Sequence, residues 1–205
     1  MNKIFVIEGT DGSGKQTQAN LIYKRLLESG RDILKTSFPN YENPSSGPVK
    51  EYLSGNITKN PNDVSSKAAS CFYAVDRYIS SNLLHQGGKL LNENNDFSKL
   101  DEFSEWILNL ECNDLELPLP TQVFFLHIPV EYSMELMKNR NNKFSHTEKK
   151  DILETDKDHL QNAEASGLYY AKKFGWKIIE CIKDGKLRSI EDINDEIYSD
   201  ILNMI

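Results

Sequence analysis

Residues 9–18, GTDGSGKQTQ, combine glycines, hydroxyls, a carboxylate and a lysine in a pattern suited to binding phosphate. Gly9, Gly14 and Lys15 have the spacing Gly-x-x-x-x-Gly-Lys, between an apolar run and a helix-like stretch. Glycines let successive backbone N–H groups face a phosphate, and the lysine reaches the β and γ phosphates of a nucleoside triphosphate. We therefore predict a triphosphate site; the alternative is a glycine-rich turn with an exposed lysine. The predicted site comprises Gly9, Thr10, Asp11, Gly12, Ser13, Gly14, Lys15, Gln16 and Thr17.

Position 16 departs from this pattern, because a glutamine stands where a hydroxyl usually helps to hold magnesium. The amide oxygen of Gln16 can accept a hydrogen bond from a magnesium-bound water, but it is a poorer direct ligand than a short hydroxyl. Thr17 does not replace it, since one residue along a helix is a rotation of about 100°. We expect triphosphate binding to persist, with Gln16 facing Mg²⁺ through water.

The elements that must position this loop are strands alternating with helices. Residues 4–7 form the continuous apolar run of a parallel strand covered on both faces, and a helix over 17–29 ends at Gly30. Further strands are predicted at 32–38, 121–129 and 176–182, and further helices at 48–57, 65–90, 99–111, 131–140, 151–174 and from 190 onward. This alternation predicts an α/β fold in one domain, residues 1–205, with helices on both faces of a mainly parallel sheet.

Composition restricts the class of partner. The chain of 205 residues has a net charge of −7, which argues against a broad nucleic-acid surface, so the positive charge for a phosphate must be supplied locally. No apolar run approaches the roughly 20 residues of a membrane helix, and no signal peptide is visible. The three cysteines lie far apart and are expected to be reduced thiols of a cytoplasmic protein.

Four segments together resemble the thymidylate kinases. These are EGTDGSGKQTQ at the first strand, SFPNY after the second, FYAVDRYISSNLLHQ, and LPLPTQVFFLHIP. They occur in the family's order over nearly the whole chain, which makes the match far more specific than the loop alone. The resemblance implies a three-layer P-loop kinase fold, ATP and Mg²⁺ as cofactors, transfer of phosphate to dTMP, and a homodimer.

The resemblance also implies roles for residues that could bind the acceptor nucleotide. Asp11 matches the carboxylate near the sugar 3′-hydroxyl, although it could instead cap the loop. Tyr73 matches the ring that stacks on thymine, and Arg77, on the same helical face, matches a side chain that bonds the base. Ordinary structural roles remain open for each substrate candidate, namely Asp11, Phe38, Tyr73, Arg77, Asn82 and Gln86, with the last two matching polar groups at the pyrimidine edge.

A basic segment, residues 140–150, resembles the family's lid over ATP. Gly12 occupies a loop position where some members carry an arginine, so the charge that stabilises transfer would come from Arg140 in this segment, near Lys143. The alternative is a solvated basic loop. The predicted catalytic set is Lys15, Asp76, Arg77 and Arg140, with Asp76 also facing the metal through water.

The chain departs from the family pattern at one place above all. Thymidylate kinases carry two Asp-Arg sites, whereas this chain has a single pair, Asp76-Arg77, whose flanking residues resemble the first site on one side and the second on the other. No apolar strand-like run lies between residues 74 and 121. We therefore expect one strand of the family sheet to be missing between 76 and 82. His127 also stands where an aspartate often ends a strand, and FPNY lacks the arginine that binds acceptor phosphate.

Two classes of protein remain possible. The first is an enzyme that transfers phosphate from ATP to dTMP. The second is a non-catalytic nucleotide-binding module, which Gln16, the uncharged FPNY and the single Asp-Arg site favour. A GTPase is disfavoured because residues 58–60, TKN, lack the strand context of a guanine-binding motif.

Overall fold

The computed structural model describes residues 3–38, 46–60, 63–74, 79–137 and 157–205, with the backbone alone described at 72–74. Its centre is a parallel sheet of β1 (Phe5–Gly9), β2 (Gln122–His127) and β3 (Lys177–Glu180), in that order. Gly9 is paired with Leu126, which is paired with Ile179, so the three carboxyl ends meet at one edge. The predicted parallel α/β sheet is confirmed.

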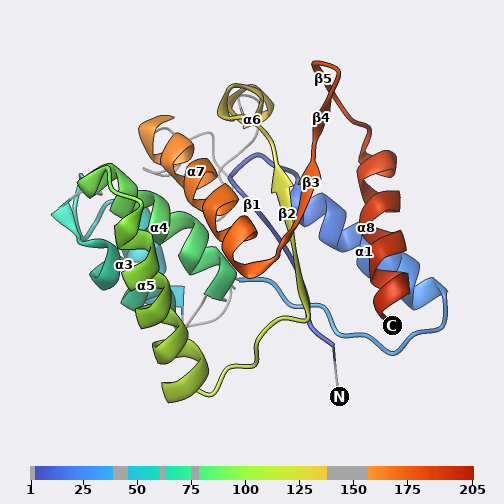
Figure 1. Cartoon of the computed structure of the whole chain (residues 1–205), viewed down its shortest axis with the longest axis horizontal. Helices are drawn as coiled ribbons and strands as arrows, with labels where there is room; N and C mark the ends of the chain where they lie inside the picture. Colours follow the sequence, from blue (N-terminus) through green and yellow to red (C-terminus); the bar gives the residue numbers. More distant parts are fainter. Residues whose placement is uncertain (1–2, 39–45, 61–62, 75–78, 138–156) are drawn as a thin grey trace.

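Helices cover both faces of the sheet, which gives three layers (Figure 1). One face carries α1 (Lys15–Glu28) and α8 (Ile190–Met204), and the other carries α4 (Ile79–Asn94) and α7 (Lys157–Phe174). Side chains along β2 alternate between them, since Phe124 and Leu126 pack against α1 and α8 while Phe125 packs against α4 and α7. We name these the α8 face and the α4 face.

Shorter elements surround this centre. Around α4 lie α3 (Ser66–Ala74) and α5 (Ser98–Leu108), and α5 continues into a π-helical segment, Asn109–Asp114. The others are α2 (Gly47–Leu53), α6 (Val130–Met137) and a hairpin of β4 (Ile182–Lys183) and β5 (Lys186–Leu187). In the described ranges no helix is long and apolar enough to cross a membrane.

Glycines allow α4 and α7 to cross closely. A Cβ atom added to Gly88 would lie 2.5 Å from the backbone nitrogen of Ala163, and one added to Gly167 would lie 2.5 Å from the ring of Phe125. Such distances are far inside van der Waals contact. The same holds at Gly87, where an added Cβ would overlap Ser166 Oγ, so the α4 face depends on three positions that have no side chain.

Most predicted elements are present within a few residues of their predicted bounds. The helix predicted at 17–29 is α1, and Gly30 follows it with a φ of +78°. The helix predicted from 190 is α8, which begins at an N-cap, Ser189, whose side chain accepts a hydrogen bond from the Asp192 N–H. The start of the helix predicted at 151–174 lies partly outside the described residues, and α7 is described from 157.

The strand predicted at 32–38 is wrong. Residues 31–37 have no regular structure, and Leu34 and Phe38 are 94% and 50% exposed. β1 is an edge strand, since of the described strands only β2 pairs with it. Residues 31–37 pair with none of the described strands, so a strand-like composition did not by itself produce a ladder here. Consistently, residues 79–121 contain no strand.

Candidate nucleotide site

The phosphate-type loop joins the carboxyl end of β1 to the start of α1. Gly12 and Gly14 adopt φ angles of +84° and +83°, which L-residues with a Cβ rarely adopt. A Cβ atom at Gly12 would also lie 2.7 Å from the carbonyl oxygen of Ser133 in α6. The predicted glycines are thus required by backbone conformation at two positions and by close packing at one of them.

Lys15 is the first residue of α1, and its amine turns back over the loop. The Nζ atom donates hydrogen bonds to the carbonyl oxygens of Gly9 (2.9 Å) and Thr10 (3.3 Å), and it lies 3.5 Å from Asp11 Oδ1. The structure therefore brings together the lysine, the carboxylate and the glycines that the sequence predicts. The positive charge is held inside the curve of the loop, where phosphate oxygens would meet it.

Two hydroxyls of the loop are buried without a hydrogen-bond partner among the described residues. They are Thr10 Oγ1 and Ser13 Oγ, although the Ser13 N–H donates to the Thr10 carbonyl over 3.2 Å. An unpaired buried hydroxyl costs about 1–3 kcal/mol, and both can donate to phosphate oxygens. Together with the first-turn N–H groups of α1, these donors fit a triphosphate group.

Gln16 and Thr17 are exposed on the first turn of α1. The oxygens available here, the Gln16 amide and the Asp11 carboxylate, fit a hydrated Mg²⁺ better than a directly ligated one, because Mg²⁺ usually keeps several waters. Asp76, the other predicted metal-facing residue, lies outside the described residues. Among the residues that are described, no cluster of three or more metal-ligand side chains occurs.

Glu8 is a buried carboxylate directly before the loop that the sequence pattern did not single out. Its Oε1 accepts a hydrogen bond from the Gly9 N–H (3.1 Å), and its Oε2 lies 3.5 Å from the hydroxyl of Ser80 in α4. Glu8 thus joins the start of the loop to α4. The signal for it was a charged residue at the end of an apolar strand, between Ile7 and Gly9.

The predicted pyrimidine-edge residues on α4 are both buried. Asn82 is fully buried, and its Nδ2 donates to Glu111 Oε1 (2.7 Å) in the π-helical segment. Three oxygens here have no described partner, namely Asn82 Oδ1, Glu111 Oε2 and Gln86 Oε1. Burial raises the pKa of Glu111 to about 7, partly offset by the bond from Asn82. An exposed helix surface is excluded for both predicted residues, and contact with a base stays a prediction.

His127, at the carboxyl end of β2, is held between two carboxylates. Its Nδ1 lies 2.8 Å from Glu180 Oε2 in β3, and its Nε2 lies 2.9 Å from Glu164 Oε1 in α7. Both ring nitrogens can donate to these carboxylates only when the ring is protonated, so the two partners favour the imidazolium form. The hydrogen bond to Glu164, followed by that to Glu180, raises the pKa of His127 above its ordinary value.

The remaining predicted residues are not brought into the site by the described structure. Phe38 is half-exposed at the end of the irregular segment. The backbone of Tyr73 lies in α3, but its side chain is not described. Asp76, Arg77, Arg140, Lys143 and the FPNY positions Pro39, Asn40 and Tyr41 lie outside the described residues.

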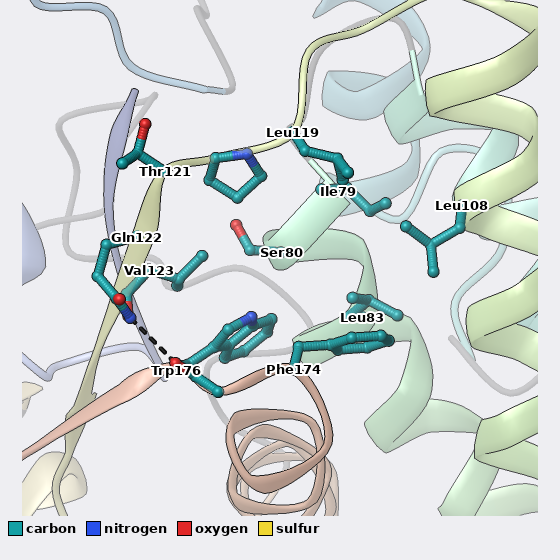
Figure 2. Close-up of a pocket in the computed structure, with 12 residues that line it drawn as sticks. Ile79, Ser80, Leu83, Leu108, Leu119, Thr121, Gln122, Val123, Phe174 and Trp176 are labelled. Carbon is teal, nitrogen blue, oxygen red and sulfur yellow. Dashed lines mark hydrogen bonds between the residues drawn. The ribbon is translucent and has the colours of Figure 1, made fainter. Parts of the chain in front are cut away.

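An apolar pocket of ≈ 210 Å³ lies elsewhere (Figure 2). Phe174 and Trp176 form one wall, and Gln122, whose amide donates to the Gly175 carbonyl over 3.2 Å, lies at its side. Gln122 and Trp176 stand at the amino-terminal ends of β2 and β3, opposite the edge that carries the loop. The pocket is smaller than typical ligand sites of about 300–1,000 Å³, and no lysine or arginine lines it. It is not the nucleotide site.

Comparison with known proteins gives one family. The family model described as thymidylate kinase matches residues 7–179. The chain is 26% identical to a thymidylate kinase of Plasmodium falciparum (97% of this chain, 89% of that protein). It is 26% identical to a probable thymidylate kinase of Methanocaldococcus jannaschii (99% and 97%) and 29% identical to a thymidylate kinase of Prochlorococcus marinus (98% and 98%).

These alignments run over 216, 227 and 221 residues, more than the 205 of this chain, so each relative has residues that this chain lacks.

Proposed function

This chain belongs to the thymidylate kinase family, and we propose that it transfers the γ-phosphate of ATP to dTMP, giving ADP and dTDP. The observation that carries the proposal is the loop between β1 and α1. Its glycines adopt left-handed backbone angles, and the Lys15 amine is held over the carbonyls of Gly9 and Thr10. Few functions other than triphosphate binding require this combination.

Catalysis in this proposal is positioning and charge neutralisation, without a covalent enzyme intermediate. Lys15 and the N–H groups at the start of α1 hold the β and γ phosphates, and Asp11 orients the acceptor sugar. Mg²⁺, when bound, would offset the charge of the phosphate oxygens, and Gln16 and Asp76 are the residues that would hold it. Arg77 binds the acceptor, and Arg140 stabilises the charge that develops during transfer.

A non-catalytic nucleotide-binding module is the second candidate. Three observations favour it: the exposed Gln16 in place of a hydroxyl, the single Asp76-Arg77 site, and β1 as an edge of a three-stranded sheet. Each of them argues against efficient binding of the acceptor nucleotide or of the metal, and none of them alters the glycine-rich loop. This candidate predicts ATP affinity without transfer.

The two candidates are separated by two measurements on the same preparation. ATP affinity is measured by calorimetry with Mg²⁺, and turnover by coupled ADP release with dTMP, dUMP, dCMP and dGMP as acceptors. Turnover that is highest with dTMP supports the kinase. Binding without acceptor-dependent turnover supports the module and removes the kinase.

A matched lysine pair tests the loop itself. Lys15→Ala removes the phosphate contact and should weaken ATP binding by roughly a hundredfold or more, since charge-assisted bonds to phosphate are lost. Lys24→Ala, on the exposed side of the same helix, should leave the affinity unchanged within about twofold. Equal affinities for both variants would contradict a phosphate-binding loop.

We also propose that the protein is a cytoplasmic homodimer, as the family resemblance implies. Light scattering on the purified chain measures its mass in solution, and a mass of a single chain at micromolar concentration would overturn the dimer.

A further inference from the structure

We infer that Asn194 of α8 is a positioning residue for the phosphate loop, acting through Gln18. Asn194 neither touches nor is expected to touch nucleotide. It holds the first turn of α1 against α8, and so fixes the direction in which Lys15 and the first N–H groups of α1 point. The inference rests on the ATP binding proposed above, but not on phosphate transfer.

The contacts form a closed network between the two helices. Gln18 is only 3% exposed, although it stands three residues after Lys15. Its Nε2 donates to the Ile190 carbonyl (3.0 Å), and its Oε1 accepts from Asn194 Nδ2 (2.8 Å). Asn194, 2% exposed, also places Nδ2 3.4 Å from the Gln18 carbonyl oxygen, and its Oδ1 accepts from Arg25 Nη1 (2.8 Å). All four amide atoms therefore have partners.

Gln18 is connected to the loop through its own backbone. Its N–H donates to the carbonyl of Gly14 (3.0 Å), and this bond closes the first turn of α1 on the residue before Lys15. Lys15 and Gln18 are three residues apart and lie close on the helix surface. A shift of Gln18 would therefore move the N–H groups and the lysine that meet phosphate, and small displacements at such sites have large effects on binding and rate.

The other end of the network is fixed to the sheet. Ile193, Ile197 and Ile201 of α8 pack in the same core cluster as Phe124 and Leu126 of β2. Residues 190–204 also lie beyond the part of the chain that the family model matches. The α8 helix thus supplies a rigid support for α1 from outside the matched segment.

A purely structural role would predict that Asn194 matters only through stability. The test therefore compares variants at equal stability, using ATP affinity with Mg²⁺ by calorimetry and stability by urea denaturation of the full chain. Asn194→Asp keeps the size and the acceptor for Arg25 but cannot donate to Gln18 Oε1, and Asn194→Ala removes both bonds. Gln18→Met removes the hydrogen bond between the two side chains by changing Gln18 in place of Asn194. The test therefore remains possible if either Asn194 variant folds poorly.

The matched controls are Ile107→Val and Ile107→Ala, in the buried core cluster that α4 and α5 share. They lower stability in two steps without changing a residue of α1 or α8, so they show how ATP affinity depends on stability alone. We expect ATP affinity to fall about tenfold in the Asn194 and Gln18 variants. We expect it to stay within about twofold in the Ile107 variants at a matched denaturation midpoint.

The inference would be overturned if ATP affinity depended on stability in the same way in the Asn194, Gln18 and control variants. It would also be overturned if ATP affinity were unchanged in all Asn194 and Gln18 variants. Absence of ATP binding by the unmodified protein would overturn it together with the proposed function. ATP binding without ADP release would remove only the proposed transfer, and the comparison of affinities would still decide the role of Asn194.

Discussion

Asn194 on the α8 face and Asn82 on the α4 face are both buried asparagines, and they are satisfied to different degrees. Asn194 donates to Gln18 and accepts from Arg25, so both ends of its amide are paired. Asn82 donates to Glu111, but its Oδ1 has no partner among the described residues. The same residue type thus completes a network in one place and leaves it open in the other.

This difference extends to the two faces as wholes. The α8 face combines an apolar cluster with a closed set of polar contacts, which suits a support for the phosphate loop. On the α4 face, Gln86 Oε1 and Glu111 Oε2 are also buried without described partners. Unpaired buried polar atoms cost about 1–3 kcal/mol each and are uncommon in folded proteins, so a group of three on one face calls for an explanation such as a bound ligand or water. The unpaired atoms thus lie on the α4 face, where the family resemblance predicts contacts to the pyrimidine.

The largest expected effect comes from separating α4 from α7 where the two helices cross. Gly88→Ala places a Cβ atom against the backbone of Ala163 and should lower the free energy of unfolding by about 3 kcal/mol. Urea denaturation measures the loss, and hydrogen exchange should show it in α4 and α7 more than in α1 and α8. Gly47→Ala meets no atom within 4 Å and should change stability by less than about 0.5 kcal/mol. Equal effects at both glycines would contradict the close crossing.

The second prediction concerns Asn82 and Glu111, a buried hydrogen-bonded pair in which each side chain has one oxygen without a described partner. The pKa of Glu111 is raised from 4.5 to about 7, so the folded state binds more protons than the unfolded state between these values. Stability should therefore fall as pH rises through this window, by about 2 kcal/mol. Glu111→Gln mimics the protonated acid and can donate to Asn82 Oδ1. It should abolish this fall and be about 2 kcal/mol more stable than the unmodified protein at pH 8.

Denaturation at pH 5 and pH 8 measures the Glu111 effect, and Glu105→Gln, on the exposed side of α5, is the matched control. A Glu111→Gln protein that loses stability at both pH values would show that the carboxylate is ionised and required.

The third prediction concerns His127, whose two ring nitrogens each lie within hydrogen-bond distance of a carboxylate. The two carboxylates beside His127 raise its pKa above 6.5, so its contribution to stability is fully present below about pH 6.5 and is lost as pH rises through the folded-state pKa. His127→Gln should cost about 1 kcal/mol at pH 5.5 and less at pH 9, after allowance for solvent screening. Thermal denaturation at both values measures the difference, and a cost that grows with pH would contradict an imidazolium.

The smallest effect on stability is expected on the α8 side, at Gln16. Gln16→Thr restores a hydroxyl at an exposed position and should change the free energy of unfolding by less than about 0.5 kcal/mol. It should nevertheless lower the Mg²⁺ concentration needed for half-maximal ATP binding, by roughly threefold to tenfold. Gln16→Ser should act in the same direction, whereas Thr17→Ser should not. No change in Mg²⁺ dependence would mean that this side chain does not face the metal.

The sequence by itself determined the glycine-rich loop, α1, α8, and the parallel character of the sheet. These features depend on local causes: glycine spacing, a left-handed turn at Gly30, an N-cap at Ser189, and the alternation of strands with helices. Local causes are visible in a single sequence because the residues that create them are neighbours in the chain. The predicted roles of Asp76, Arg77 and Arg140 depend on the family resemblance and stay predictions.

Only the tertiary structure decided what depends on distant partners. Residues 32–38 have the composition of a strand, yet they pair with none of the described strands. Asn82 and Glu111 are 29 positions apart and meet only because the π-helical segment packs beside α4. The pKa of His127 is raised because β3 and α7 each bring a carboxylate to its ring. Pairing and burial are set by the packing of whole elements, and no local pattern in the sequence specifies them.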